Sequence, residues 1–134
     1  MSIVLDAGPM IAYLSTEPGG DLVREFLEDG DVPIFAHVVN LAEVFYHYSR
    51  DADVLSARRF IAALHADGVV ARADLDTALW EDAAQLKADW RRISLADCFG
   101  IALARKLGAD FVTTDHHELD VLDTAGVCSF VFIR

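Results

Sequence analysis

The chain has 134 residues, of which 54% are hydrophobic and 25% charged, and its formal net charge is −11. This length predicts a single domain over residues 1–134, and the apolar content excludes a disordered chain. No apolar run approaches the roughly 18 residues of a membrane span, so we expect no membrane partner. The negative net charge disfavours nucleic-acid binding, because such binding depends on neutralising phosphates with basic residues. Salt screens charges more than about 8 Å apart, however, so a local basic patch can still bind phosphate.

Two features of the sequence bear on the compartment. Cys98 and Cys128 lie in apolar segments and are too few for a disulfide framework. No basic residue precedes Arg24, and Asp6 interrupts the first apolar run, which does not fit a secretory signal. We therefore expect a reducing, cytoplasmic setting.

Short β-branched runs alternate with amphipathic segments along the chain. Strands are predicted at residues 2–6, 32–36, 69–71, 111–114 and 128–133. Helices are predicted at residues 9–14, 21–29, 40–50, 53–66, 75–92 and 94–107, with a short helical turn at 118–122. Pro9 suits the first position of the first helix. This alternation predicts an α/β fold with a mainly parallel sheet that helices cover on both faces.

Two acids directly follow predicted strands: Asp6 follows the first strand and Asp115 the fourth. Ligands of parallel sheets bind beyond the carboxyl ends of the strands, where the strand order reverses. If the first and fourth strands are neighbours at that reversal, Asp6 and Asp115 lie close together. Each of them can also cap the helical segment that follows it.

Two further acids, Glu43 and Asp97, lie in the first turns of predicted helices. Ser94-Leu-Ala-Asp97 has the capping-box pattern, and Asn40-Leu-Ala-Glu43 is a looser version of it. Capping therefore explains each acid taken singly. The two interpretations of Asp97 differ in geometry, because a cap points its carboxylate at the backbone N–H of Ser94 and a metal ligand points it at Asp6.

The four acids taken together are harder to explain by capping. At one sheet edge they place about four negative charges in a small volume, where they repel one another by several kcal/mol unless neutralised. A set of oxygen ligands favours a hard ion, Mg²⁺ or Mn²⁺, over zinc. Such an ion also leaves positions for phosphate oxygens and a water molecule, which indicates phosphate chemistry.

Four acidic segments follow one another in order: Ile3 to Leu14 with Asp6, Asn40-Leu-Ala-Glu43-Val, Ser94-Leu-Ala-Asp97-Cys, and Val112-Thr-Thr-Asp115. Together they resemble the motifs of PIN-domain ribonucleases, most closely the VapC toxins of type II toxin–antitoxin pairs. The resemblance implies a three-layer α/β/α fold with a five-stranded parallel sheet of order 3-2-1-4-5. It further implies Mg²⁺- or Mn²⁺-dependent endonucleolytic cleavage of RNA, homodimers, and inhibition by a cognate antitoxin.

The resemblance carries the catalytic and metal-binding roles onto Asp6, Glu43, Asp97 and Asp115. One departure is Ala7, where many relatives have Ser or Thr. A hydroxyl that orients Asp6 is then either missing or supplied by Thr113 or Thr114.

Several nearby residues have two interpretations each. Glu118 and Asp120 either reach the metal through water or are exposed turn acids. His116 and His117 either contact a phosphate or belong to a polar surface turn. His47 either faces the cleft or is a partly buried structural histidine.

Among the basic residues we expect only a minority to contact phosphate, and the candidates are Arg50, Arg58, Arg59, Arg91, Arg92, Arg105 and Lys106. Trp80 and Trp90 can stack on bases, although Trp90 continues an apolar stripe and is expected in the core.

The alternative function is a non-enzymatic acid-pocket module for regulation or binding, either receiver-like or an inactive PIN-like domain. A receiver domain places paired acids after its first strand, whereas Asp6 stands alone. A phosphatase of the haloacid-dehalogenase type needs a second Asp at position 8, which is Gly8. The nuclease is therefore the favoured interpretation.

Overall fold

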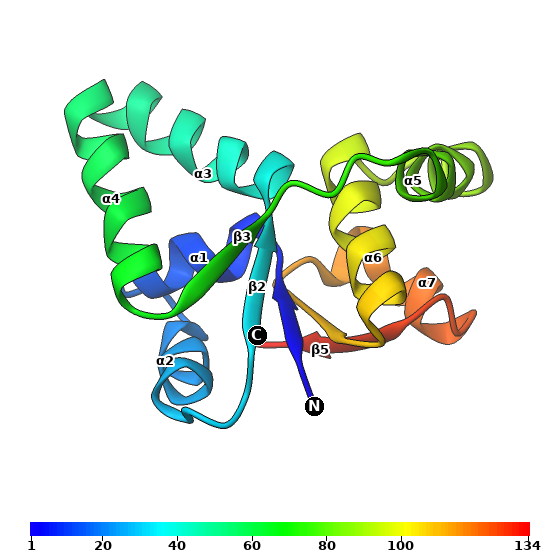
Figure 1. The fold of residues 1–134 in the computed structure, drawn as a ribbon, viewed down its shortest axis with the longest axis horizontal. Helices are drawn as coiled ribbons and strands as arrows, with labels where there is room; N and C mark the ends of the chain where they lie inside the picture. Colours follow the sequence, from blue (N-terminus) through cyan, green and yellow to red (C-terminus); the bar gives the residue numbers. More distant parts are fainter.

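The computed structural model, which describes residues 1–134, contains one parallel five-stranded sheet of order β3-β2-β1-β4-β5 (Figure 1). Its strands are β1 (Ile3–Leu5), β2 (Ile34–His37), β3 (Val69–Arg72), β4 (Asp110–Thr113) and β5 (Ser129–Phe132). The predicted α/β class and strand order are confirmed. None of the helices is long and apolar enough to cross a bilayer.

Helices cover both faces of this sheet. They are α1 (Ala7–Leu14), α2 (Gly20–Glu28), α3 (Val38–Asp51), α4 (Val54–Ala66), α5 (Thr77–Asp89), α6 (Leu95–Leu107) and α7 (His116–Thr124). Figure 1 shows α1 to α4 on one side of the strands and α5 to α7 on the other. Ile3 and Leu5 join the apolar cluster of the first group and Val4 joins that of the second, because successive strand residues point to opposite faces.

The bounds of three helices, α1, α5 and α7, differ from the prediction for reasons that the structure shows. The first helix begins at Ala7, so Pro9 is its third residue, where its missing N–H still leaves no hydrogen bond unmade. The helix predicted at 75–92 spans only Thr77–Asp89, because Asp76 caps its start and the chain leaves the helix at Trp90. The turn predicted at 118–122 is a full helix from His116 to Thr124, which Asp115 caps.

The reversal of strand order lies between β1 and β4, which are neighbours in register, with Leu5 beside Val112. The Asp6 N–H extends this pairing by donating to the Val112 carbonyl at 2.9 Å. The helix α1 then passes so close to β4 that a Cβ at Gly8 would collide with the Thr114 hydroxyl. The end of β1 is thereby fixed against the end of β4.

The helix α6 is held equally close to the sheet. A Cβ at Gly100 would lie 2.6 Å from Cε1 of the buried Phe111 ring on β4 and 2.7 Å from Oδ1 of Asn40 on α3. Only glycine fits this position without displacing its neighbours. The first turn of α6, which carries Asp97, is therefore held against both α3 and the sheet.

Candidate functional site

Asp6 is the buried carboxylate at the centre of the sheet edge. It caps α1, with Oδ1 accepting from the Ala7 N–H at 2.8 Å and Oδ2 accepting from the Thr113 hydroxyl at 2.9 Å. The Thr113 hydroxyl also accepts from the Asp115 N–H at 3.1 Å. Thr113, rather than Thr114, thus supplies the hydroxyl that Ala7 lacks, and it joins the ends of β1 and β4.

Asp97 faces Asp6 and does not complete the capping box. The Ser94 hydroxyl caps α6 by accepting from the Asp97 N–H at 3.0 Å, but the Asp97 carboxylate makes no hydrogen bond to the Ser94 backbone. Asp97 is 9% exposed, and its carboxyl lies close to the Asp6 carboxyl and also to the Ser94 hydroxyl. Of the two geometries expected for Asp97, the structure has the one that points across the strand ends.

Burial and mutual repulsion make this pair hard to ionise. Burial raises the pKa of Asp97 to about 8, and the neighbouring Asp6 contributes to that increase. Burial also raises the pKa of Asp6 to about 6, although the hydrogen bonds from Thr113 and Ala7 act in the opposite direction. Two carboxyls in contact share a proton or a cation more readily than they ionise together. The pair therefore favours a bound positive charge.

Glu43 and Asp115 flank the pair. Glu43 on α3 is half-buried, and burial together with the charge of Asp97 raises its pKa. Asp115 caps α7 by accepting from the Glu118 N–H at 3.0 Å, and its charge also acts on Asp97. Asp6, Glu43 and Asp115 thus each lie close enough to Asp97 to act on it or be acted on by it, with Asp6 and Asp115 at the N-caps of α1 and α7 and the other two on α3 and α6.

The looser capping box proposed for α3 is wrong. The helix begins at Val38, so Glu43 lies in its second turn and cannot cap it. His37 caps the helix instead, with Nδ1 accepting from the Val39 N–H at 3.1 Å. Asn40 ties α3 to α6 by donating from Nδ2 to the Ala96 carbonyl at 3.1 Å, next to Asp97.

Asp6 and Asp97, with Glu43 and Asp115 in the surrounding elements, offer oxygen ligands at the end of a parallel sheet, and hard divalent cations prefer such ligands. In the side-chain conformations of this structure, no three Asp, Glu, His or Cys side chains are arranged to hold an ion. The donor chemistry therefore fits Mg²⁺ or Mn²⁺, whereas a complete ligand cage is not assembled.

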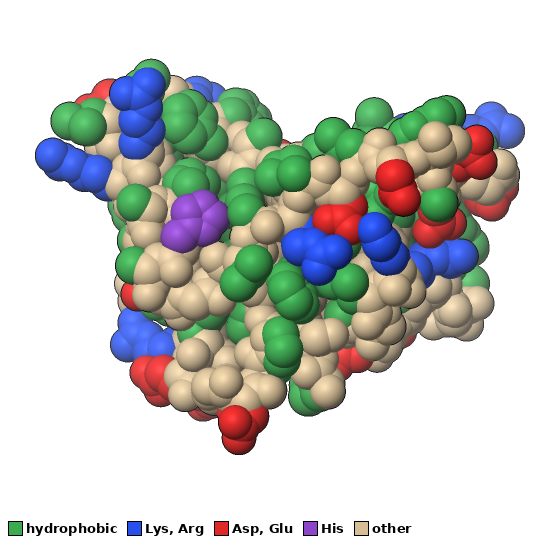
Figure 2. Space-filling view, in the orientation of Figure 1, with side chains coloured by type: hydrophobic (Ala, Val, Ile, Leu, Met, Phe, Trp, Pro, Cys, Tyr) green, Lys and Arg blue, Asp and Glu red, His purple; other side chains and the backbone are tan.

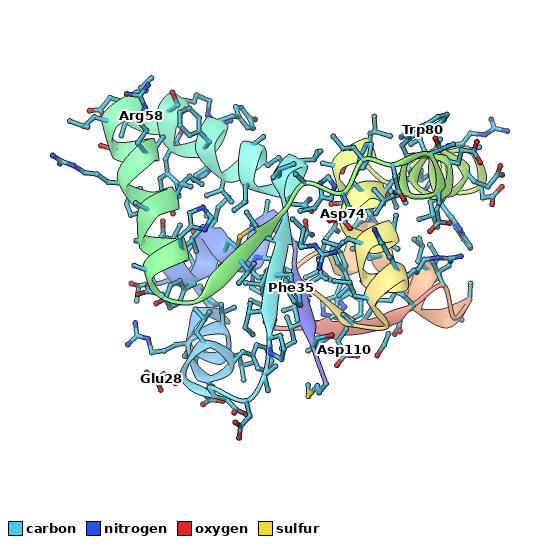
Figure 3. The ribbon with its side chains drawn as sticks, in the orientation of Figure 1. Glu28, Phe35, Arg58, Asp74, Trp80 and Asp110 are labelled. Atoms are coloured by element: carbon cyan, nitrogen blue, oxygen red, sulfur yellow. The ribbon has the colours of Figure 1, made fainter.

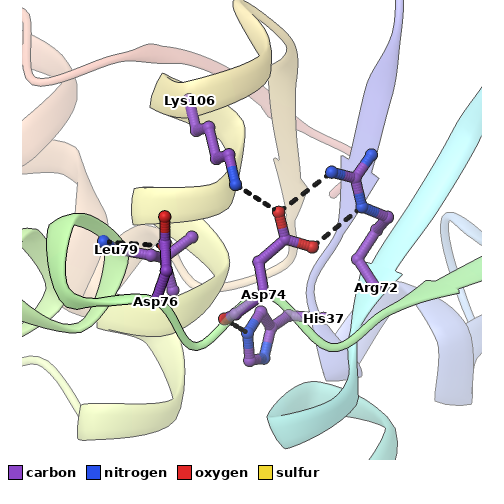
Figure 4. A network of polar contacts seen from close by, with 6 residues as sticks. All are labelled: His37, Arg72, Asp74, Asp76, Leu79 and Lys106. Carbon is purple, nitrogen blue, oxygen red and sulfur yellow. Dashed lines mark hydrogen bonds and ion pairs between the residues drawn. The ribbon is translucent and has the colours of Figure 1, made fainter.

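Sequence reasoning missed a polar network beside this edge, shown in Figure 4. The buried His37 donates from Nε2 to the Asp74 carbonyl at 2.9 Å. The Asp74 carboxylate receives two hydrogen bonds from Arg72, each 2.9 Å long, and one of 2.6 Å from Lys106. The network joins β2, the β3–α5 connection and α6. The only sequence signal was the Arg72-Ala-Asp74 spacing.

This network should make stability depend on acid pH. Hydrogen bonds from Arg72 and Lys106 lower the pKa of Asp74, so its contribution is present above the unfolded pKa of about 4 and is lost below it. We expect Asp74→Asn to cost about 1–2 kcal/mol at pH 7, because charged hydrogen bonds are lost. Urea unfolding of both proteins should show that difference shrinking as the pH falls below about 4. A difference that stays constant would contradict this role.

Three candidates for phosphate contact are already paired with acids. Lys106 binds Asp74, Arg105 lies 3.1 Å from Asp82, and Arg50 lies 2.9 Å from Asp51. Arg58, Arg59, Arg91 and Arg92 make no ion pair. On the face shown in Figure 2, basic and acidic side chains lie intermingled over α5 and α6, without a continuous basic patch.

The remaining candidates have mostly local partners. His116 contacts Asp120 at 2.9 Å and stacks on Phe132. His116 and Asp120 therefore each have a structural partner. His47 lies 3.6 Å from Asp51.

The two tryptophans differ in exposure, and His117 is a solvent-facing residue of α7. Trp80 is 46% exposed on α5 (Figure 3), and the side chain of His117 is 89% exposed. Trp90, expected in the core, is only partly buried, because the helix ends before it.

Solved structures with a similar fold include two VapBC complexes and one VapC toxin. VapBC2 from Rickettsia felis, bound to a fragment of promoter DNA, is 12% identical, with 98% of each chain covered and a TM-score of 0.74. DNA-bound VapBC from Salmonella typhimurium is 13% identical over 100% of this chain and 99% of the other, with a TM-score of 0.74. VapC20 from Mycobacterium tuberculosis, a toxin that cleaves the Sarcin-Ricin loop, is 16% identical over 89% and 94%, with a TM-score of 0.69.

The TM-scores establish a common fold, although the sequence identities are low. No curated protein sequence gives a significant match. The sequence model of the PIN domain matches residues 3–124, which is most of the chain. The chain therefore belongs to the PIN domain family.

Proposed function

We propose that this PIN-domain protein is a Mg²⁺- or Mn²⁺-dependent endoribonuclease that hydrolyses RNA phosphodiester bonds at Asp6, Glu43, Asp97 and Asp115. The observation that carries the proposal is the orientation of Asp97. Its carboxyl lies close to that of the buried Asp6 and makes no hydrogen bond to the Ser94 backbone. Two carboxylates in contact repel each other, and a cation that binds between or beside them removes this repulsion and stabilises the arrangement.

When bound, the cation would lower the pKa of an attacking water and neutralise charge on the scissile phosphate. The protein contributes fixed positions. Asp6 is held by Thr113 and the Ala7 N–H, and Asp115 by the Glu118 N–H, so their carboxylates are oriented before substrate arrives. Each of these carboxylates retains free lone pairs for a ligand.

Partner binding is the second part of the proposal. The structural neighbours from Rickettsia felis and Salmonella typhimurium are VapBC complexes, and the fold of this chain matches theirs over nearly its full length. We propose that this chain is the toxin of such a pair, forms homodimers and is inhibited by a cognate antitoxin. A small reading frame beside its gene, whose product copurifies with it and suppresses RNA cleavage, would support this assignment.

Metal removal tests the enzymatic proposal directly. Purified protein should cut a single-stranded RNA in Mg²⁺ or Mn²⁺ and lose that activity in EDTA, with recovery when metal is restored. Cleavage that is equally fast in EDTA would contradict the proposed chemistry. RNA binding without cleavage in either metal would support the non-enzymatic alternative.

A further inference from the structure

A pocket of about 310 Å³ lies between the α5–α6 connection and the first turns of α7. Its lining includes Trp90, Arg91 and Arg92 from the connection and His117 and Glu118 from α7. This volume is at the small end of ligand pockets, which run from about 300 to 1,000 Å³.

Both walls of the pocket are continuous along the chain with segments that carry acids of the candidate site. The α5–α6 connection leads into Ser94, which caps the helix that carries Asp97. On the other wall, His117 and Glu118 follow Asp115, and the Glu118 N–H is bonded to the Asp115 carboxylate. A ligand chain that crosses the acids can therefore extend into the pocket.

Two adjacent arginines of the pocket have no acidic partner within the protein. Five of the eleven Lys and Arg side chains of this acidic protein are paired with acids, as Lys106 is with Asp74 and Arg105 with Asp82. Arg91 and Arg92 are exposed and make no ion pair. Adjacent unpaired arginines beside an acidic site favour a ligand that carries phosphate.

The connection that carries these arginines is itself held in place. Lys87 donates from Nζ to the carbonyls of Arg91 at 2.8 Å and Ile93 at 2.6 Å. Trp90 packs partly against the core cluster of α5, α6 and α7 and also lines the pocket. Its ring is therefore a supported surface, as aromatic residues that stack on unpaired bases usually are.

The two acids of the pocket do not remove its preference for a ligand that carries phosphate. Glu118 lies 3.8 Å from His117, and Asp89 accepts a hydrogen bond from Gln85 at 2.9 Å. Both carboxylates have a local partner, whereas the two guanidinium groups of the connection have none.

We propose that this pocket binds one nucleotide of single-stranded RNA beside the scissile phosphate. Trp90 stacks on the base, and Arg91 and Arg92 contact the adjoining phosphates. An unpaired base is required, because a base inside a duplex does not expose its face for stacking. The inference rests on the proposed ribonuclease function and adds a specific contact surface to it.

RNA binding without cleavage tests the arginines. In EDTA, anisotropy of a labelled single-stranded RNA should show Arg91→Ala/Arg92→Ala binding about tenfold or more weakly than wild type. The slope of log K against log salt should fall by about 1.4, since each lost phosphate contact contributes about 0.7.

The matched control is Arg58→Ala/Arg59→Ala, because these two phosphate candidates of the sequence lie on α4, on the other side of the sheet from the pocket. It removes the same charge, and Figure 3 places Arg58 far from α7. Its affinity should stay within about twofold of wild type. An equal loss of RNA affinity in the control variant would overturn the proposal, and so would an unchanged salt slope in the Arg91/Arg92 variant.

Fluorescence tests the stacking contact separately. In a Trp80→Phe background Trp90 is the only tryptophan, and RNA should quench its emission. Trp90→Leu retains an apolar side chain for packing and should weaken RNA binding about 5- to 100-fold, whereas Trp90→Phe should largely restore it. No quenching, or equal binding by the Leu variant, would overturn the contact.

The two proposals fail in different ways. Normal RNA cleavage by the Arg91/Arg92 and Trp90→Leu variants, with unchanged affinity, would reject the pocket and leave the ribonuclease assignment intact. Quenching of Trp90 by RNA in a protein that cleaves none in Mg²⁺ or Mn²⁺ would support the pocket and reject the ribonuclease.

Discussion

If the proposed ribonuclease site is correct, replacing Asp97 with Asn is expected to reduce RNA cleavage at least about 10²- to 10³-fold, because it removes one of the four acids proposed to bind the catalytic cation. The fold should survive, since Ser94 caps α6 through the Asp97 N–H, which the substitution retains. Initial rates on a single-stranded RNA in Mg²⁺, together with circular dichroism, measure both effects.

Asp123→Asn is the matched control for Asp97→Asn. Asp123 is an exposed acid on α7 whose side chain makes no hydrogen bond, so its replacement removes the same charge away from the cluster. We expect wild-type rates from this variant. Wild-type cleavage by Asp97→Asn would instead show that Asp97 has only a structural role.

The second large effect is on stability as a function of pH. The pKa values of Asp97 and Asp6 are raised by burial, so their neutral forms stabilise the fold below the unfolded pKa of about 4. That contribution is lost as the pH rises through the folded pKa, which is about 8 for Asp97. Metal-free wild type should therefore lose stability between pH 5 and pH 8, by on the order of 2–4 kcal/mol.

Asp97→Asn removes the titrating group and most of this loss. Urea unfolding in EDTA should show that the free energy of unfolding of the variant, relative to that of wild type, increases as the pH increases from 5 to 8. Mg²⁺ at pH 8 should restore stability to wild type and have a smaller effect on the variant, because a ligand that binds only the folded state stabilises it. Parallel pH profiles for the two proteins would contradict the raised pKa and the proposed repulsion.

The position of Asp6 and Asp115 was predictable because it depends on a general property of parallel sheets. Both residues end a β-branched run, and parallel strands bring their carboxyl ends to one edge. The capping pattern of Ser94 was equally visible, and its hydroxyl does cap α6. What the pattern could not decide was the direction of the Asp97 carboxylate, which depends on the buried partner opposite it.

The features that escaped prediction depend on distant contacts. Histidine is an uncommon helix cap, and His37 is fixed by a carbonyl that lies 37 residues further along the chain. From the sequence Lys106 was a candidate for phosphate contact, but in the fold it forms an ion pair with Asp74. Trp90 continued a helical stripe in the sequence, but the helix ends at Asp89, which leaves the ring at a pocket wall.

The most direct test of the central claim is the anomalous scattering of Mn²⁺ in crystals of the wild-type protein. The account predicts a peak at the carboxyl ends of β1 and β4, bound by oxygens of Asp6 and Asp97 at about 2.0–2.2 Å, with Glu43 or Asp115 beside it. The peak should be absent from Asp97→Asn crystals. Mn²⁺ bound elsewhere, in a protein that cleaves RNA in Mn²⁺, would contradict the assignment of these acids.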